Sequence, residues 1–190
     1  MKRSVAALIG FVLAALALVA GPAWAASATA ATPYCGIQWG SLEKGVTTGT
    51  VGPEVGTLTD LRAGRHACYD RLVLDVQGRS AGYTVRYVPE LVQGGSGHVV
   101  HVDGGARLEI VADLLATDAG GNRLYDPADP GHAVDVSGFG TFRQVASLGN
   151  VEAREVVGLG VRARLPFRVF ELDGPGSGSR LVVDVAHRWS

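Results

Sequence analysis

The chain has 190 residues, 47% of them hydrophobic, and it carries 17 basic against 18 acidic residues, for a formal net charge of −1 at pH 7. This balance argues against nucleic acid as the main partner, because nucleic-acid-binding domains are basic. The length suits one domain with a sizeable core, preceded by a targeting segment.

Residues 1–25 have the features of that targeting segment. Lys2 and Arg3 form a basic start, an apolar run follows from residue 5 to 20, and Ala23-Trp24-Ala25 fits the A-x-A rule for signal cleavage. We predict a cleaved signal peptide; a retained anchor is the alternative, although the run is short for a span of ~20 residues. Cleavage would leave 15 basic and 18 acidic residues, a net charge of −3. The remaining chain is then expected outside the cytoplasm, extracellular or envelope-associated, with no further membrane span.

Residues 26–33 are a linker of small residues, and we predict a single β domain over 34–190. The only two cysteines, Cys35 and Cys68, form a disulfide in this hypothesis, because exported proteins with an even cysteine count are usually disulfide-bonded. The bond would contribute ~3–4 kcal/mol to the free energy of unfolding, because it restricts the conformational entropy of the unfolded chain. A metal-binding or nucleophilic thiol is the alternative, but the spacing is poor for zinc. We expect no metal and no cofactor.

The remaining elements are expected in chain order as short strands. Residues 41–58 are rich in Thr and Gly and predict a long loop or a weak edge strand. Strands are predicted over 71–76, 82–88, 97–102 and 106–115, with Asp103-Gly104-Gly105 joining the last two as a hairpin. Composition alone would also allow a helix over 106–115.

The second half is punctuated by glycine. Residues 116–133 are turn-rich and should run over the surface. Residues 151–172 predict two strands with Gly-Leu-Gly as a bend or bulge, and 174–179 form a loop before a last strand. The predicted fold class is all-β, an antiparallel β-sandwich with no long helix after the signal peptide.

One pattern occurs twice, as "RLVLDV" from Arg71 and as "RLVVDV" from Arg180. Strand alternation places three aliphatic side chains of each copy on one face and an Arg-Val-Asp row on the other. If the copies pair antiparallel in register, Arg71 lies opposite Asp184 and Asp75 opposite Arg180, which would fix the register. The alternatives are that each copy anchors its own half of the fold, or that the two Asp residues form a catalytic pair.

The stretch "GGSGHVVHVD" contains Ser96, His98, His101 and Asp103. It fails the G-x-S-x-G pattern of a nucleophile elbow, because residue 98 is His. On a strand the two histidines would point to opposite faces, which is unsuitable for zinc. A turn followed by an exposed strand is the favoured interpretation, and a loop nucleophile or metal site is the alternative.

In "VRARLPFRVF", Arg162, Arg164, Arg168 and Phe170 share one strand parity. Pro166 in the same run predicts an edge strand or a bulge. The arginines are either a solvated face that blocks edge pairing or an anion-binding strip, because guanidinium groups suit carboxylate and phosphate. Trp39 and Trp189 are interpreted as packing residues, with glycan stacking as the alternative.

Six segments together, "CGIQWGSLEK", "HACYDRLVLDV", "GYTVRYV", "FGTFRQVASLGN", "GLGVRARLPFRVFEL" and "RLVVDVAHRW", resemble the AMIN-like domain proteins exported by high-GC Gram-positive bacteria. The resemblance implies a β-sandwich related to AMIN domains, which accompany cell-wall amidases and secretins and target them to peptidoglycan. Many family members resemble lipoproteins, but this chain has no lipidation cysteine. The resemblance supplies no active-site residues.

The leading hypothesis is a non-catalytic envelope module that binds cell-wall glycan, peptide or anionic polymer through an arginine-lined face. The second is a carrier of a small ligand, which would need a concave apolar pocket. The third is a hydrolase that uses the region of Ser96 and His98.

Overall fold

A computed structural model describes residues 32–47 and 55–189. The chain divides into two units, residues 1–30 and 31–190, and every described residue belongs to the second. The predicted signal peptide and most of the predicted linker lie outside the described residues. The strands are β1 Lys44–Thr47, β2 Thr57–Arg65, β3 Tyr69–Gln77, β4 Gly82–Val88, β5 Leu91–Val92, β6 Val99–Val100, β7 Ala106–Asp113, β8 Phe142–Val151, β9 Arg154–Val161, β10 Phe167–Asp173 and β11 Ser179–Ala186. Two short 3₁₀ turns, η1 Tyr34–Gly36 and η2 Pro130–His132, complete the described elements.

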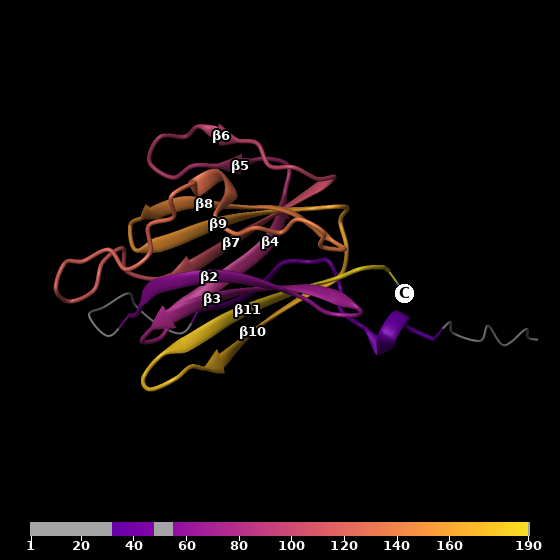
Figure 1. Cartoon of the computed structure of the whole chain (residues 1–190), viewed down its shortest axis with the longest axis horizontal. Coiled ribbons are helices and arrows are strands. Elements are labelled where there is room, and N and C mark those ends of the chain that lie inside the picture. Colours follow the sequence, from indigo (N-terminus) through magenta and orange to yellow (C-terminus); the bar gives the residue numbers. More distant parts are fainter. Residues whose placement is uncertain (1–31, 48–54, 190) are drawn as a thin grey trace, which may run out of the picture. The chain divides into compact units, whose positions relative to one another are not determined.

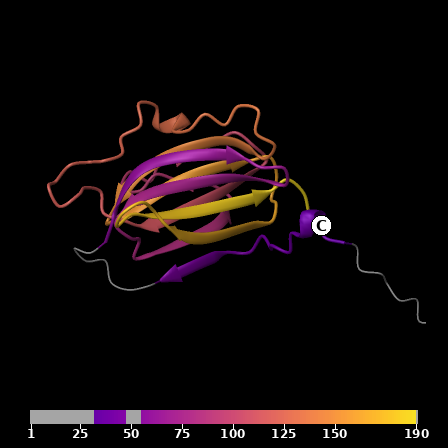
Figure 2. The ribbon, with the colours of Figure 1, turned by 60° about the horizontal axis from the view of Figure 1, so that its bottom comes forward.

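The strands form two stacked sheets and a small hairpin (Figures 1 and 2). One sheet has five strands in the order β1-β4-β7-β9-β8, the other has four in the order β10-β11-β3-β2, and β5 pairs with β6. Every neighbouring pair of strands is antiparallel. The prediction of an antiparallel β-sandwich is therefore confirmed. In the described part of the chain, no helix has the length and apolar character to cross a membrane.

The core lies between the two sheets. Alternate residues of each strand point inward, and these positions carry aliphatic side chains. The four-stranded sheet contributes Leu72, Leu74, Val76, Leu181, Val183 and Val185, and the five-stranded sheet contributes Val85, Leu108, Ile110, Val157, Leu159 and Val161. All are at most 4% exposed, so both copies of the repeated pattern bury their three aliphatic residues as expected.

The two copies of the repeat are neighbours in one sheet. Strands β3 and β11 pair antiparallel, with Arg71 opposite Asp184, Val73 opposite Val182, and Asp75 opposite Arg180. The antiparallel register expected from the charge pattern is therefore confirmed.

The hairpin predicted across Asp103-Gly104-Gly105 is wrong. Strand β6 is only two residues long and pairs with β5, whereas β7 pairs with β4 and β9. The β5–β6 hairpin lies over the outer surface of the five-stranded sheet (Figure 1). It forms a second apolar cluster there with residues of β8, consisting of Leu91, Val102, Ala146 and Leu148.

The two glycines of Gly-Leu-Gly do not form the bend or bulge that was expected in their own strand. Gly158 and Gly160 lie within the continuous strand β9, and the register shifts fall on its partner β8. A Cβ on Gly158 would lie 2.6 Å from a methyl group of Leu91, and a Cβ on Gly160 would overlap the carbonyl oxygen of Asp103. These glycines therefore let the hairpin pack closely against the sheet.

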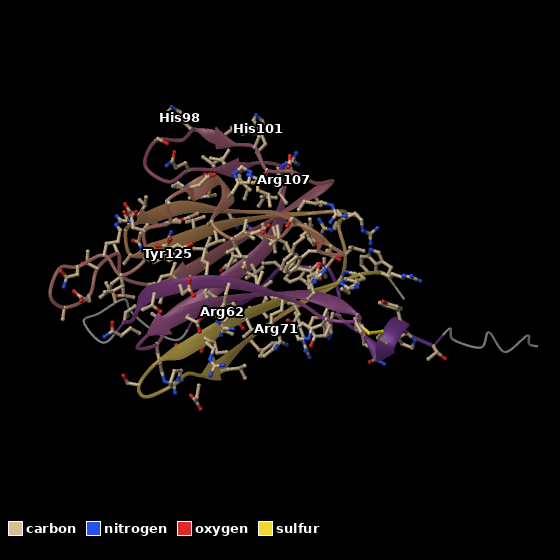
Figure 3. The ribbon with its side chains drawn as sticks, in the orientation of Figure 1. Arg62, Arg71, His98, His101, Arg107 and Tyr125 are labelled. Carbon is tan, nitrogen blue, oxygen red and sulfur yellow. A yellow bond between two sulfur atoms is a disulfide. The ribbon has the colours of Figure 1, made fainter. Side chains whose placement is uncertain are left out.

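Residues 114–141 connect β7 to β8 of the five-stranded sheet, and most of them lie at the surface, as expected for a turn-rich stretch. Tyr125 of this segment packs against the core (Figure 3), and its hydroxyl is buried without a hydrogen-bond partner among the described residues. Burial, together with the charges of Asp60 and Glu155, raises the pKa of Tyr125 to about 12.

Candidate binding face

Asp184 lies at the centre of the outer surface of the four-stranded sheet, and its side chain is 0% exposed. Arg71 on β3 donates from Nε to Oδ1 at 2.6 Å and from Nη2 to Oδ2 at 2.9 Å. Arg168 on β10 donates from Nε to Oδ2 at 2.8 Å. Hydrogen bonding to the carboxylate raises the pKa of Arg71 further. Two permanent cations therefore share one anion, and one positive charge stays uncompensated within the trio.

Three aromatic rings surround the Arg168 guanidinium. Its central carbon lies 4.4 Å from the ring centroid of Trp39, 5.0 Å from that of Phe170 and 5.6 Å from that of Tyr69. The Arg71 guanidinium lies 5.5 Å from the rings of Tyr69 and Phe170. These are cation–π distances. All three rings are half-buried, so each keeps an accessible part. We define the arginine–aromatic face as Trp39, Tyr69, Arg71, Arg168, Phe170 and Asp184.

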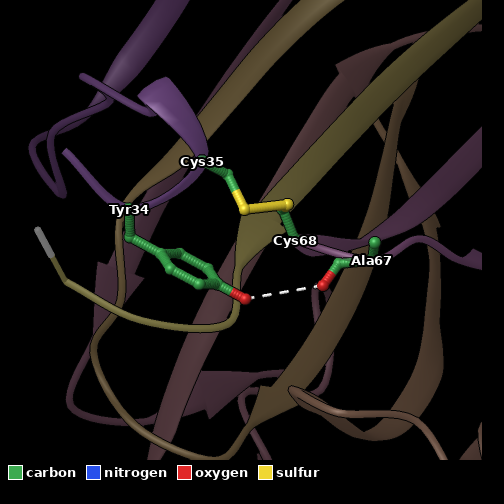
Figure 4. Close-up of a disulfide and its surroundings, with 4 residues drawn as sticks. All are labelled: Tyr34, Cys35, Ala67 and Cys68. Carbon is green, nitrogen blue, oxygen red and sulfur yellow. Dashed lines mark hydrogen bonds between the residues drawn. A yellow bond between two sulfur atoms is a disulfide. The ribbon is translucent and has the colours of Figure 1, made fainter. Parts of the chain in front are cut away.

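The disulfide positions one of these rings. Cys35 and Cys68 are bonded, which confirms the prediction, and Cys68 directly precedes β3 (Figure 4). The Tyr34 hydroxyl adds a hydrogen bond to the carbonyl of Ala67. The chain then runs to Trp39, whose ring meets Tyr69 edge-on at 5.5 Å. The N-terminal segment is thereby fastened to the sheet beside the two arginines.

The outer row of the repeat is more deeply covered than strand alternation alone predicts. Val73 is 4% and Val182 1% exposed, although both point away from the core between the sheets. Arg62 lies opposite Val73 and Phe170 lies opposite Val182 on the neighbouring strands. Long side chains of this kind can cover adjacent apolar surface with their stems and rings.

One of the two expected charge pairs forms and the other does not. Asp75 lies opposite Arg180, but its carboxylate binds Arg62 of β2 through both oxygen atoms. Arg180 instead donates to the carbonyl of Asp173 at 3.0 Å, and its Nε is buried without a partner among the described residues. The prediction failed because β2, which supplies Arg62, was not anticipated on the other side of β3.

The predicted arginine strip is divided between two places. Strand β9 ends at Val161 and β10 begins at Phe167, so strand parity does not continue through residues 162–166. Arg168 and Phe170 belong to the arginine–aromatic face. Arg162 donates to the carbonyl of His187 at 2.5 Å, and Arg164 donates to the side chain and carbonyl of Ser41. The expectation of an edge strand after Pro166 is confirmed, because β10 is the edge of its sheet.

The residues from Ser96 to Asp103 were candidates for a catalytic or metal site. In the described part of the chain, the fold does not bring them together with a further side chain that would complete such a site. The Ser96 hydroxyl donates to the side chain of Gln93, and the labelled His98 and His101 project from the β5–β6 hairpin (Figure 3). The described residues contain no group of three or more His, Cys, Asp or Glu side chains that could hold a metal ion.

A buried Asp–His pair was missed in the sequence. Asp70 is 0% exposed and accepts hydrogen bonds from the backbone N–H groups of Thr141 and Phe142 at 2.5 and 3.1 Å. Its other oxygen lies 3.1 Å from Nε2 of His187. The Thr141 hydroxyl donates to the carbonyl of Ala186 instead of to His187. The pair therefore ties the ends of β3, β8 and β11 together, and within the described part of the chain no nucleophilic side chain hydrogen-bonds to His187 or Asp70.

Two cavities, of about 470 and 460 Å³, lie side by side at one end of the sandwich, with Gln77 and Ser177 in the lining of both. Their linings mix polar and apolar surface, with the carboxylates of Asp60 and Asp75 in one and that of Asp118 in the other. They do not provide the apolar pocket that a carrier would need.

Comparison with known proteins gives one result. A family model described as the AMIN-like domain matches residues 56–187, which is most of the chain and includes all ten strands from β2 to β11 in full. No curated protein and no solved structure matches the chain at a significant level.

Proposed function

Because this chain belongs to the AMIN-like domain family, we propose that it is a non-catalytic, extracytoplasmic binding module that associates with the cell wall. The disulfide between Cys35 and Cys68 fits an oxidising compartment outside the cytoplasm. The family supports an envelope-associated binding role at this coarse level, and the choice of ligand and surface is our proposal.

The observation that carries the proposal is the composition of the arginine–aromatic face. Arg71 and Arg168 offer donors and one net positive charge, while Trp39, Tyr69 and Phe170 offer partly accessible rings. Guanidinium groups bind carboxylates and phosphates in fixed geometry. Aromatic faces provide flat apolar surface on which a sugar ring can stack.

Cell-wall polymers combine these two chemistries. Peptidoglycan has sugar rings that carry peptides with carboxylates, and anionic wall polymers have sugars or polyols with phosphates or carboxylates. A flat, cationic and aromatic sheet surface is suited to such a repeating ligand, because contacts can be spread over several units.

Co-sedimentation with purified cell wall tests the proposal. We expect the protein to pellet with the wall at low salt and to be released as salt rises, because exposed charges are screened. Phe170→Ala and Arg168→Gln should each reduce the bound fraction severalfold. Arg86→Gln is the matched control, since Arg86 is an exposed arginine of the other sheet that pairs with Glu109.

Thermal unfolding of each variant separates loss of binding from loss of folding. The proposal fails if the wild-type protein stays in the supernatant at low salt. It also fails if a folded protein in which Arg162, Arg164 and Arg168 are all Ala binds as well as the wild type.

A further inference from the structure

A cavity of about 350 Å³ opens where β4 ends and β7 begins. It is lined by residues 87–89, residues 105–107 and Arg164, none of which belongs to the arginine–aromatic face. The backbone at Gly105 lies so close to the chain at Arg162 that a Cβ on residue 105 would be 2.5 Å from the carbonyl oxygen of Arg162. Only glycine therefore fits at this position of the cavity wall. The chain between β9 and β10 can therefore pass close to the start of β7, which brings Arg164 and Arg107 (Figure 3) to one cavity.

Both arginines of this cavity are held in place by neutral oxygen atoms. Arg164 donates from Nε to the Ser41 hydroxyl at 3.2 Å and from Nη2 to the Ser41 carbonyl at 3.0 Å. Arg107 donates from Nη1 to the carbonyl of Pro89 at 3.3 Å. These bonds orient the guanidinium groups but do not neutralise them.

Neither arginine forms an ion pair with a carboxylate in the described part of the chain, and no acidic side chain lines the cavity. In contrast, a carboxylate partner lies within 4.0 Å of several other arginines, namely Arg62, Arg71, Arg79, Arg86, Arg154 and Arg168. Two uncompensated cations beside one concavity form a preorganised site for negative charge.

Tyr87 supplies an aromatic ring to the wall of the cavity, and hydrogen bonds hold this ring in place. The Tyr87 hydroxyl donates to the carbonyl of Leu165 and accepts from its N–H, each at 2.9 Å. The ring is thereby fixed beneath the Arg164 guanidinium, 4.9 Å from its centroid. Burial raises the pKa of Tyr87, so this residue adds no negative charge near neutral pH.

We propose that this cavity binds an oxyanion, the carboxylate or phosphate group of a small ligand or of a polymer end, through Arg107 and Arg164. Paired guanidinium groups match the planar or tetrahedral oxygen arrangement of such groups. Tyr87 and Pro89 supply apolar contact for the atoms that carry the anion. The proposal does not depend on cell-wall binding by the arginine–aromatic face, because none of the residues that line the cavity belongs to that face.

NMR titration of the ¹⁵N-labelled protein tests it, with the arginine Nε–Hε signals as the readout. Inorganic phosphate and acetate are titrated separately, with sodium chloride adjusted to keep ionic strength constant. We expect the Arg107 and Arg164 signals to move with a saturable dependence on at least one anion. Saturation by phosphate alone assigns a phosphate-bearing ligand, and saturation by acetate assigns a carboxylate.

Arg65 is the matched internal control. It also donates to a backbone carbonyl, that of Gly138, and lies over an aromatic ring, that of Phe139, but it is not among the residues that line the cavity. Its signal should not show saturable movement. Arg107→Gln and Arg164→Gln should each weaken anion binding at least tenfold.

The proposal is overturned if neither anion gives saturable movement, if Arg65 moves in parallel with the other two, or if a folded double variant binds as tightly as the wild type. Since the wild-type titration is informative alone, a variant that fails to fold does not remove the test. The readout uses free anions, so failure of cell-wall binding leaves it unaffected.

Discussion

The outer surfaces of the two sheets are shielded from water in different ways. On the four-stranded sheet, Val73, Val182 and Asp184 are at most 4% exposed, and their neighbours on the adjacent strands are the arginine and aromatic side chains Arg62, Phe170, Arg71 and Arg168. On the five-stranded sheet, a separate segment of chain, the β5–β6 hairpin, covers the end of β8 and β9 with apolar side chains.

This difference decides which surface can recognise a ligand. The side-chain cover of the four-stranded sheet keeps charge and rings partly in solvent, with two guanidinium groups on one carboxylate. On the five-stranded sheet, Arg86 pairs with Glu109 and with Glu43, and Arg154 pairs with Asp113, so each of these arginines has at least one carboxylate of its own. Ion pairs with solvent-exposed arginines are weak. The arginine–aromatic face therefore differs in that two guanidinium groups share one carboxylate beside three aromatic rings.

The largest expected effect comes from removing the disulfide, which fastens Trp39 to the four-stranded sheet. The bond joins residues 33 positions apart, so Cys35→Ser with Cys68→Ser should lower the free energy of unfolding by roughly 3–4 kcal/mol, by loop entropy. Urea denaturation with and without reductant measures this. The wild type should lose stability on reduction and the double variant should not. Equal midpoints for the oxidised wild type and the double variant would contradict the prediction.

The next effect concerns the centre of the same face. Asp184→Ala leaves two guanidinium groups without their shared anion and should lower the free energy of unfolding by about 3 kcal/mol. This value is at the lower end of the range for breaking a buried ion pair, because the two arginines are partly exposed. Asp173→Ala is the control. Its pair with Arg79 is largely exposed, so its loss should cost less than about 1 kcal/mol. Similar denaturation midpoints for the two variants would show that the burial of Asp184 has little energetic weight.

A smaller effect is expected on the five-stranded sheet. Gly160→Ala places a methyl group against the backbone carbonyl of Asp103, so the base of the β5–β6 hairpin must shift, at a cost of about 1–3 kcal/mol. Gly158→Ala meets only the end of the flexible Leu91 side chain and should cost less. Hydrogen exchange in residues 91–102 measures the loosening. Both variants should bind cell wall like the wild type. A loss of binding in a folded Gly160→Ala protein would indicate that the ligand binds to the five-stranded sheet, which contradicts the proposal.

The sequence alone was enough to predict those features that depend on the alternation of side chains along a single strand. The two RLV-aliphatic-DV copies could be aligned because period-two alternation and opposite charges allow only one favourable antiparallel register. The disulfide followed from the cysteine count and the signal segment. The pairing of Arg71 with Asp184 could therefore be anticipated, but the second arginine on Asp184 could not, because Arg168 was placed on a longer strand with Arg162 and Arg164.

The remaining features depend on breaks in alternation and on contacts between distant segments. Strand β2 has a register shift between Leu58 and Asp60, so Leu58 and Leu61 both point inward although they are three residues apart. That spacing conceals a strand from a period-two search. Trp39 and Tyr69 join the face through the fold of the N-terminal segment, and no local pattern encodes that meeting.

The smallest expected effect extends the comparison to a buried carboxylate of the five-stranded sheet. Glu155 of the five-stranded sheet is 6% exposed, yet it has no cationic ion-pair partner within 4.0 Å among the described residues, only the amide of Asn150, which donates at 3.2 Å. Burial raises the pKa of Glu155, which the Asn150 bond and the nearby charge of Arg123 offset in part. A raised pKa in the folded state means that folding favours the protonated form. Its contribution to stability is present below the ordinary pKa of glutamate and is lost as pH rises through the folded-state pKa.

Glu155→Gln should therefore remove this pH dependence while keeping an acceptor for Asn150. We expect the variant to match the wild type near pH 4 and to become more stable than the wild type as pH rises to 8. Urea denaturation across this range measures the difference. Glu109→Gln is the control, since Glu109 pairs with Arg86 at 2.8 Å and its neutralisation should not stabilise the protein at high pH. A Glu155→Gln variant that is less stable than the wild type at pH 8 would mean that this carboxylate, like that of Asp184, is adequately compensated in the folded protein.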